Sequence, residues 1–249
     1  MRIVILGAGG VGGQLAVRLA LAGRDVAVLA RGAHLEAIRA RGLTLKTPDD
    51  TVTAPLEAAA SAEGMAAADV VIFAVKGQDL DGAMELSVPL IGPRTLLLPF
   101  LNGVEAPARL AARFGEALSE SQALTGIARI SAVIDAPGTI LQNSAAAHYT
   151  IGDAATGRQD TPAVRAVKQA LAVPGVVLDE HADVRVALWE KFVLLAALAG
   201  TTAGGRCTVG EVLALAPLRQ LARDIAAEVA AVARAQGVPL PENAAEAAV

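Results

Sequence analysis

The fold of this chain is decided at its beginning, by the stretch Arg2-Ile3-Val4-Ile5-Leu6-Gly7-Ala8-Gly9-Gly10-Val11-Gly12. The apolar, largely β-branched residues that open it predict a buried parallel strand. The glycines follow the spacing G-x-G-x-x-G, and the next residues, Gln14–Ala22, have the periodicity of a helix. A second apolar run, Asp25–Ala30, completes a β-α-β unit of the length expected for one crossover connection.

Strand-like and helical segments continue to alternate as far as Leu101. Strands are predicted at Leu43–Lys46, Thr51–Ala54, Asp69–Val75 and Thr95–Leu101, and helices at Ala33–Arg41 and Leu80–Leu90. Such alternation is typical of a doubly wound parallel sheet.

The pattern changes after Leu124. Short runs predict antiparallel strands that extend the sheet, then a helix and a last strand: Ile127–Ile134, Thr139–Gln142, Ala147–Ile151, Pro162–Leu171 and Val176–Leu178. Beyond His181 only helices are predicted, at Asp183–Ala199 and Gly210–Gln236. We therefore predict an α/β protein with a Rossmann-type doubly wound domain in residues 1–181 and an all-helical domain in residues 182–249.

The composition excludes several classes of protein. With 249 residues, 54% of them hydrophobic, the chain is neither disordered nor too short for a large core. Aromatic residues make up 2% and the net charge is −4, which argues against a nucleic-acid partner. The single cysteine, Cys207, excludes an internal disulfide, and the three scattered histidines argue against a zinc enzyme.

The glycine-rich turn predicts a dinucleotide site, formed by Gly7-Ala8-Gly9-Gly10-Val11-Gly12. Gly7 allows the tight turn, Gly9 lets the backbone approach the pyrophosphate, and Gly12 lets helix and strand pack closely. The pyrophosphate would lie at the helix N-terminus, where unpaired N–H groups favour negative charge. A glycine-rich turn without a ligand is the alternative.

Arg31 predicts which dinucleotide is bound. NAD-binding proteins carry an acidic residue about 20 residues after the glycines, at the end of the second strand. Here that place is taken by Ala30-Arg31, and Asp25 lies at the wrong end of the strand. A guanidinium can bind a 2′-phosphate through two hydrogen bonds, so we favour NADPH, with a solvated surface arginine as the alternative.

Two more polar residues follow predicted strands. Lys76 comes after Asp69–Val75, and Asn102 comes after Thr95–Leu101. Ligands of doubly wound sheets bind at the carboxyl ends of the strands. We therefore expect Lys76 near the cofactor phosphate or ribose and Asn102 near the nicotinamide, although either residue could also simply cap a loop.

Four motifs together resemble the ketopantoate reductases (2-dehydropantoate 2-reductases) over nearly the whole chain. They are the opening stretch Arg2–Gly12, Val75-Lys76, Asn102-Gly103-Val104-Glu105 and Leu188-Trp189-Glu190-Lys191. The resemblance implies NADPH-dependent reduction of 2-dehydropantoate to pantoate, a step of pantothenate biosynthesis, in a cleft between a Rossmann domain and a helical domain. It also implies that Arg31 faces the 2′-phosphate and that Lys76 and Asn102 line the cleft.

The same resemblance makes Lys191 the catalytic lysine. Hydride transfer to a ketone leaves negative charge on the oxygen, which a nearby ammonium stabilises and can protonate. Lys191 precedes the apolar run Phe192–Ala197, where burial would lower its pKa. The alternative is a lysine whose side chain extends along the helix to water.

The chain departs from the family at three places. Family members carry asparagines four and eight residues after the lysine, where this chain has Leu195 and Ala199. They also continue beyond the point where this chain ends, so we expect an incomplete helical domain with exposed apolar surface. Thr201 and Thr202 are candidate replacements for the missing polar groups, or simply polar residues near a helix end.

These departures leave several readings open. They are reduction of another ketone or 2-keto acid, a non-catalytic NADP-binding sensor, and a related 3-hydroxy acid or opine-type dehydrogenase, whose substrate motif is not found after the glycines. Equally open is whether the chain forms a homodimer.

We expect a cytoplasmic protein with no membrane association. The longest charge-free stretches, Ile3–Val17 and Phe192–Gly205, are shorter than the ~20 apolar residues of a membrane-spanning helix. The glycines from Gly7 to Gly13 also interrupt the apolar segment that a secretory signal needs.

Overall fold

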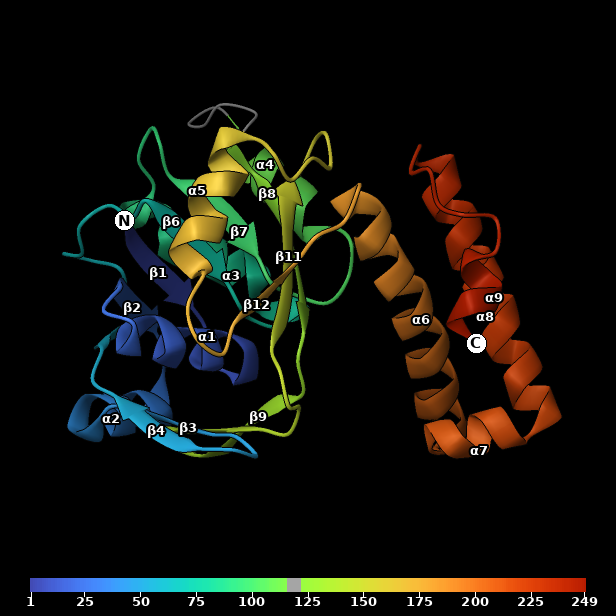
Figure 1. The fold of residues 1–249 in the computed structure, drawn as a ribbon, viewed down its shortest axis with the longest axis horizontal. Helices are drawn as coiled ribbons and strands as arrows, with labels where there is room; N and C mark the ends of the chain where they lie inside the picture. The colour runs from blue at the N-terminus through green and yellow to red at the C-terminus, as the bar shows by residue number, and fades with distance from the viewer. Residues whose placement is uncertain (116–121) are drawn as a thin grey trace. The chain divides into compact units, whose positions relative to one another are not determined.

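The computed structural model describes residues 1–115 and 122–249 and is shown in Figure 1. These residues form two compact units, Met1–Val184 and Arg185–Val249. All of the described strands belong to the first unit, and the second is built of helices.

The first unit is built on a parallel sheet with the strand order β5-β2-β1-β6-β7. Its strands are β1 (Arg2–Leu6), β2 (Asp25–Leu29), β5 (Glu57–Ala59), β6 (Val70–Phe73) and β7 (Leu96–Pro99). In the register, Ile3 of β1 lies opposite Val26 of β2 and Val70 of β6. Every strand pair within this five-stranded sheet is parallel, which confirms the predicted doubly wound sheet.

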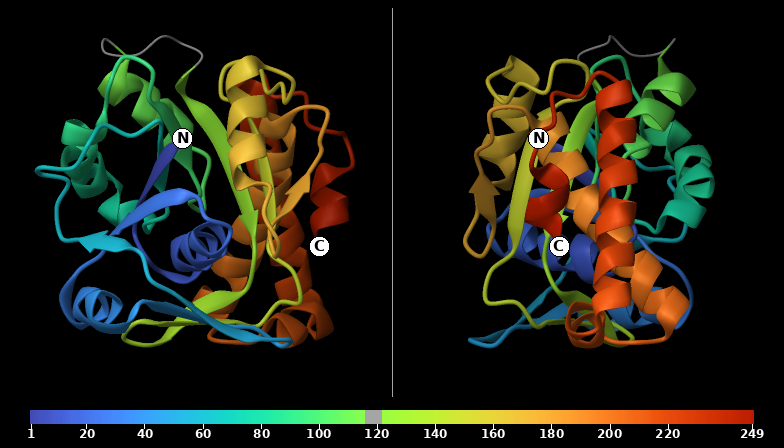
Figure 2. Two further views of the ribbon diagram at one scale, coloured as in Figure 1. Left: turned by 60° about the vertical axis from the view of Figure 1, so that its left-hand side comes forward. Right: turned by 90° about the vertical axis from the view of Figure 1, so that its right-hand side faces the viewer.

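Alternate residues of β1 serve two apolar cores, because successive side chains of a strand point to opposite faces. Ile3 and Ile5 belong to one core, together with residues of α1 (Gly10–Leu21) and α5 (Pro162–Leu171). Val4 and Leu6 belong to the other, with α3 (Leu80–Ser87) and α4 (Ala106–Phe114). Helices therefore cover both faces of the sheet (Figure 2).

The remaining strands form two further sheets instead of extending the first. Their orders are β4-β3-β10-β9 and β12-β11-β8. The strands are β3 (Leu43–Lys46), β4 (Thr51–Ala54), β8 (Leu124–Arg129), β9 (Ala132–Ala136), β10 (Thr139–Gln142), β11 (His148–Asp153) and β12 (Val177–Asp179).

The predicted extension of the parallel sheet was therefore wrong. Its nearest equivalent is a single bridge between Leu97, in β7, and Ala123, just before β8. The reason lies in α1, whose side chains Leu15, Ala16 and Val17 are all buried. A helix that is apolar on every side must be covered on every side, and the sheet containing β3 and β10 packs on α1.

The second unit contains α6 (Val184–Gly205), apart from its first residue, together with α7 (Val209–Ala214), α8 (Ala216–Ala235) and α9 (Ala244–Ala248). The helix predicted from residue 183 to 199 therefore runs further, to Gly205. The segment predicted as one helix from residue 210 to 236 is broken at Leu215, whose backbone is extended. The next helix begins directly after it and has a proline in its first turn. Thr208 and Glu211 cap α7 reciprocally, with each side chain bonding to the other's backbone N–H.

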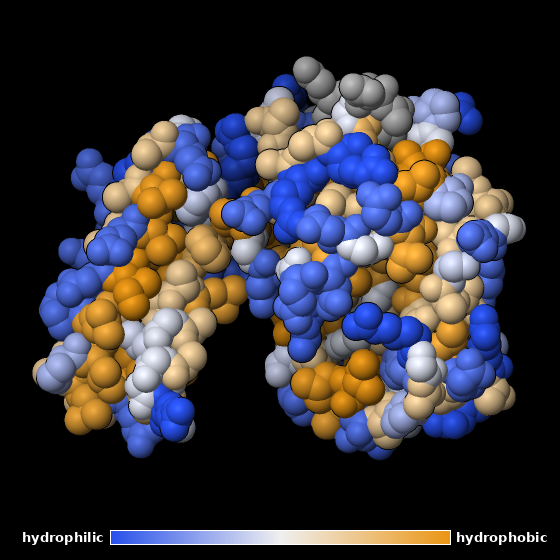
Figure 3. Space-filling view, turned by 180° about the vertical axis from the view of Figure 1, so that it is seen from behind, coloured by the Kyte–Doolittle hydropathy of each residue, from blue (hydrophilic) through white to orange (hydrophobic). Residues whose placement is uncertain are grey.

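By length and composition alone, α6 could cross a membrane, a feature that the count of charge-free residues did not detect. Core helices of soluble proteins meet the same criterion. Large apolar side chains are exposed on this unit, including Leu194, Leu215, Leu221 and Val232. Figure 3 shows apolar residues on its surface.

Candidate functional site

The glycine-rich turn after β1 gives each of its three signature glycines a different task. Gly7 has φ +99°, a conformation that favours glycine, and Gly9 begins α1 as its N-cap. A Cβ added at Gly12 would lie 2.1 Å from the Gly7 carbonyl oxygen, 2.9 Å from the Ala74 Cβ and 3.0 Å from Ile5 Cγ2. A Cβ added at Gly9 would meet nothing within 4 Å. Gly12 is therefore needed for packing, whereas Gly9 leaves open space at the helix N-terminus that fits a phosphate group.

Two neighbouring glycines allow close contacts that the G-x-G-x-x-G motif does not predict. A Cβ at Gly10 would lie 2.1 Å from the Ala132 carbonyl oxygen at the start of β9. A Cβ at Gly13 would lie 2.8 Å from the Ile140 side chain of β10. Both glycines admit the second sheet onto α1, and nothing in the local sequence identifies these distant partners.

His34 supports the turn, and the sequence analysis did not single it out. It lies in α2 (Gly32–Arg41), where its Nδ1 accepts a hydrogen bond from the Gly138 N–H at 3.0 Å. The ring proton is therefore on Nε2, which donates to the Ala8 carbonyl oxygen at 2.8 Å. His34 thus ties the glycine-rich turn to α2 and to the turn between β9 and β10. Its only sequence signal is its place in the first turn of the helix that follows Arg31.

Arg31 lies just beyond β2, as the N-cap of α2. Its side chain is 87% exposed, and its Nη2 lies 3.5 Å from Asp79 Oδ1. A surface ion pair of this kind contributes at most about 1 kcal/mol. The guanidinium is therefore accessible to an anionic ligand that displaces Asp79.

Lys76 and Asn102 follow β6 and β7 and so lie at the same edge of the parallel sheet as the glycine-rich turn. Both side chains are exposed. The turn packs directly against the chain that leads to Lys76, since a Cβ at Gly7 would lie 3.0 Å from Val75 Cγ1. Asn102 precedes Gly103, whose φ of +99° makes the sharp bend into α4. The carboxyl edge of the sheet therefore carries the turn, Arg31, Lys76 and Asn102.

Lys191 belongs to the second unit, on α6, and is half-buried. Leu195 and Ala199 follow it at helical spacing and share its face of the helix. On the same helix, Trp189 and Phe192 form an edge-on ring contact, with centroids 5.8 Å apart. An ammonium on this apolar face can bind a carbonyl or carboxylate oxygen.

The two threonines further along α6 are engaged with their own helix. Thr201 donates its hydroxyl hydrogen to the Ala197 carbonyl at 2.7 Å, and Thr202 donates to the Leu198 carbonyl at 2.7 Å. This pairing favours a structural role over substitution for the missing polar groups.

Comparison with known proteins follows the same division of the chain. The family model for ketopantoate reductase PanE/ApbA matches residues 3–156, and the model for its C-terminal part matches residues 183–249. The chain belongs to the ketopantoate reductase family. The resemblance drawn from the four motifs is thereby confirmed.

Individual relatives of this ketopantoate reductase family member agree. A 2-dehydropantoate 2-reductase from Mesorhizobium japonicum is 34% identical over 97% of this chain and 78% of its own length. The crystal structure of 2-dehydropantoate 2-reductase from Porphyromonas gingivalis superposes with a TM-score of 0.89 at 28% identity, covering 100% of this chain and 86% of that one. D-mandelate dehydrogenase with NADH and anilino(oxo)acetate shares the fold, with a TM-score of 0.86 at 18% identity over 100% of this chain and 78% of that one.

Proposed function

We propose that this protein is an NADPH-dependent reductase of a 2-keto acid, by default converting 2-dehydropantoate to pantoate in pantothenate biosynthesis. Its family and named relatives support this reaction. The structural observation that carries the proposal is the open space at Gly9, on a turn whose other glycines are required for packing. That arrangement is expected of a dinucleotide site and is unexplained in a turn that serves packing alone.

NADPH, more than NADH, fits the carboxyl edge of the sheet. The Arg31 guanidinium is exposed, and the end of β2 lacks the acid that would bind a ribose 2′-hydroxyl. A 2′-phosphate would replace the Asp79 carboxylate as the partner of Arg31 and offer a stronger, doubly bonded interaction. Lys76 would add positive charge to the same edge, and the glycine-rich turn with Ala8 and Val11 would hold the pyrophosphate.

Lys191 is proposed to bind the keto oxygen and to deliver the proton. When bound, the cofactor supplies the hydride. The oxygen then gains negative charge, and the Lys191 ammonium stabilises that charge and protonates the alkoxide. Asn102 is proposed to orient the reactants through its amide, which can both donate and accept.

A second candidate is reduction of a less polar 2-keto acid. Leu195 and Ala199 offer no hydrogen bond to a substrate hydroxyl, and the hydroxyls of Thr201 and Thr202 are bound to the helix backbone. A site without such partners does not discriminate in favour of a hydroxylated substrate. A sensor that binds NADP without turnover is the third candidate.

The remaining assignments are proposals of the same kind. Residues 1–181 would bind the cofactor and residues 182–249 the substrate. We propose that the protein acts in the cytoplasm on small molecules, without nucleic acid or membrane. Its exposed apolar side chains on α8, such as Leu221 and Val232, would suit a homodimer.

The test is NADPH oxidation, followed by absorbance, with 2-dehydropantoate and with bulkier, apolar 2-keto acids. We expect turnover with at least one of them and its near-complete loss in Lys191→Ala. The control is Lys46→Ala, which removes an equal charge from an exposed ion pair with Asp135 in β9. Equal rates in wild type and Lys191→Ala would remove Lys191 from catalysis. NADPH binding without turnover of any keto acid would select the sensor.

A further inference from the structure

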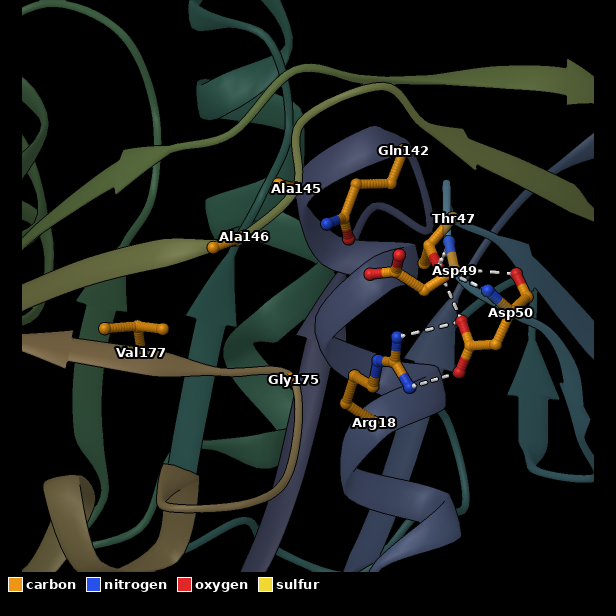
Figure 4. Close-up of a pocket in the computed structure, with 9 residues that line it drawn as sticks. All are labelled: Arg18, Thr47, Asp49, Asp50, Gln142, Ala145, Ala146, Gly175 and Val177. Carbon is orange, nitrogen blue, oxygen red and sulfur yellow. Dashed lines mark hydrogen bonds and ion pairs between the residues drawn. The ribbon is translucent and has the colours of Figure 1, made fainter.

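A cavity of about 230 Å³ lies within the first unit, away from the glycine-rich turn (Figure 4). It is bounded by the end of α1 at Arg18, the β3–β4 turn at Asp49 and Asp50, and the segments around Gln142 and Val177. Arg18 follows Gly10 by about 12 Å along the helix, at 1.5 Å rise per residue. A ligand here would therefore not share the proposed cofactor site.

Gln142 supplies a buried acceptor without a partner. The residue is 3% exposed, and its Oε1 is the one side-chain amide oxygen among the residues described that is both buried and without a hydrogen bond. The orientation of the amide is fixed because Nε2 donates to the Ser144 carbonyl at 2.8 Å. Figure 4 shows the amide directed into the cavity. Leaving a buried carbonyl unpaired costs about 1–3 kcal/mol, so a donor is missing at this point.

The charges around the cavity leave one carboxylate unneutralised. Asp50 accepts hydrogen bonds from both Arg18 Nη atoms, at 3.2 and 3.3 Å, and from Thr47 Oγ1 at 2.6 Å. The Thr47 hydroxyl and then the Arg18 guanidinium lower the pKa of Asp50, so this pair is neutral as a whole. Asp49 lines the same cavity, and within the described residues its carboxylate forms no hydrogen bond or ion pair.

The other buried group without a partner at this place does not call for a ligand. It is the Nε–H of Arg18, which faces Gly175. A Cβ added at Gly175 would lie 2.5 Å from this nitrogen, so little room remains on that side. The groups that can receive a ligand are thus two acceptors, Gln142 Oε1 and the Asp49 carboxylate, and the cavity carries a net negative charge.

We propose that this cavity binds a small primary ammonium ion on a short carbon chain. The –NH₃⁺ group has three donors and no acceptor, which matches a buried amide oxygen beside a carboxylate. Ala145, Ala146 and Val177 form the walls that the carbon chain would contact. The cavity volume of about 230 Å³ exceeds the ~30 Å³ that one water occupies in the liquid, so the cavity has room for a ligand larger than a water molecule.

The experiment compares two cations of equal charge, propylammonium and tetramethylammonium chloride, at the same ionic strength. Only the first has N–H donors. We expect propylammonium to raise the melting temperature in a saturable manner and to give a measurable Kd by calorimetry, and tetramethylammonium to do neither. Equal effects of the two salts, or no effect of either, would overturn the proposal.

Variants locate the site. Two variants are used: Asp49→Asn, at an exposed turn position, and Gln142→Met, which keeps the side-chain length. Each should weaken propylammonium binding at least about tenfold, because each removes one charge-assisted hydrogen bond. The control is Glu63→Gln, which removes an equal charge at an exposed position outside the cavity lining. Unchanged binding in Asp49→Asn would refute the site even if Gln142→Met folds poorly.

Discussion

Gly9→Ala separates a ligand-binding glycine from a packing glycine. Gly9 has φ −77° and ψ −163°, which alanine adopts without strain, and its added Cβ would touch nothing within 4 Å. The only expected loss of folding stability comes from the weaker N-cap and is about 1 kcal/mol or less. The new methyl group would, however, occupy the space proposed for the pyrophosphate.

The expected loss of affinity follows from the contacts that the methyl group removes. Holding a phosphate away from the helix N-terminus breaks at least one hydrogen bond to a charged group, worth about 1.5–3 kcal/mol. NADPH should therefore bind about ten- to a hundredfold more weakly. The binding is measured by calorimetric titration, with thermal unfolding as the check on folding.

Two glycines serve as controls. Gly12→Ala forces a Cβ to 2.1 Å from the Gly7 carbonyl oxygen. It should therefore destabilise the fold by about 3 kcal/mol or more, the upper end of the range for substitutions that overpack a core. Gly82→Ala, in α3, meets nothing within 4 Å, so it should leave NADPH affinity intact and should not lower stability, because alanine favours a helix more than glycine does. If Gly9→Ala binds NADPH as tightly as wild type, the reasoning about the open space is refuted.

Three further substitutions test other parts of the first unit, Met1–Val184. Arg31→Ala should weaken NADPH about tenfold or more and leave NADH nearly unchanged, since only the former carries the 2′-phosphate; an unchanged preference in paired titrations would refute the cofactor assignment. His34→Phe loses the bonds to both the turn and Gly138, and should weaken NADPH severalfold in the same titration while leaving a folded protein; full affinity would contradict its positioning role. Tyr149→Phe removes the buried hydroxyl that donates to Gln14 Oε1 at 2.7 Å, and should lower the free energy of unfolding in denaturant by about 1–3 kcal/mol. An unchanged free energy of unfolding would show that this hydrogen bond does not stabilise the core. Burial raises the pKa of Tyr149, so the free energy of unfolding of wild type should fall as the pH rises above about 10, where the unfolded tyrosine ionises first, and this decline should be smaller in the phenylalanine variant.

Local sequence sufficed where the determinant is itself local. The run Ile3–Leu6 and the glycines after it specify strand, turn and helix through sterics within a few residues, and the structure has them as predicted. The same holds for the short strands Leu43–Lys46 and Thr51–Ala54, which flank a polar turn. The positions of Arg31, Lys76 and Asn102 at the ends of strands were likewise predictable, since parallel strands place their carboxyl ends at one edge.

Tertiary structure decided what depends on partners far apart in the chain. Sequence periodicity does not reveal that β10 pairs with β3, or that Gly10 lies under the Ala132 carbonyl, because the pairing partner is chosen by which apolar surfaces remain to be covered. Nor does it show that His34 joins Ala8 to Gly138, or that the Gln142 amide oxygen faces a cavity beside Asp49. Backbone conformation is set within a few residues, whereas hydrogen-bond partners and cavities arise only when segments separated by a hundred residues pack together.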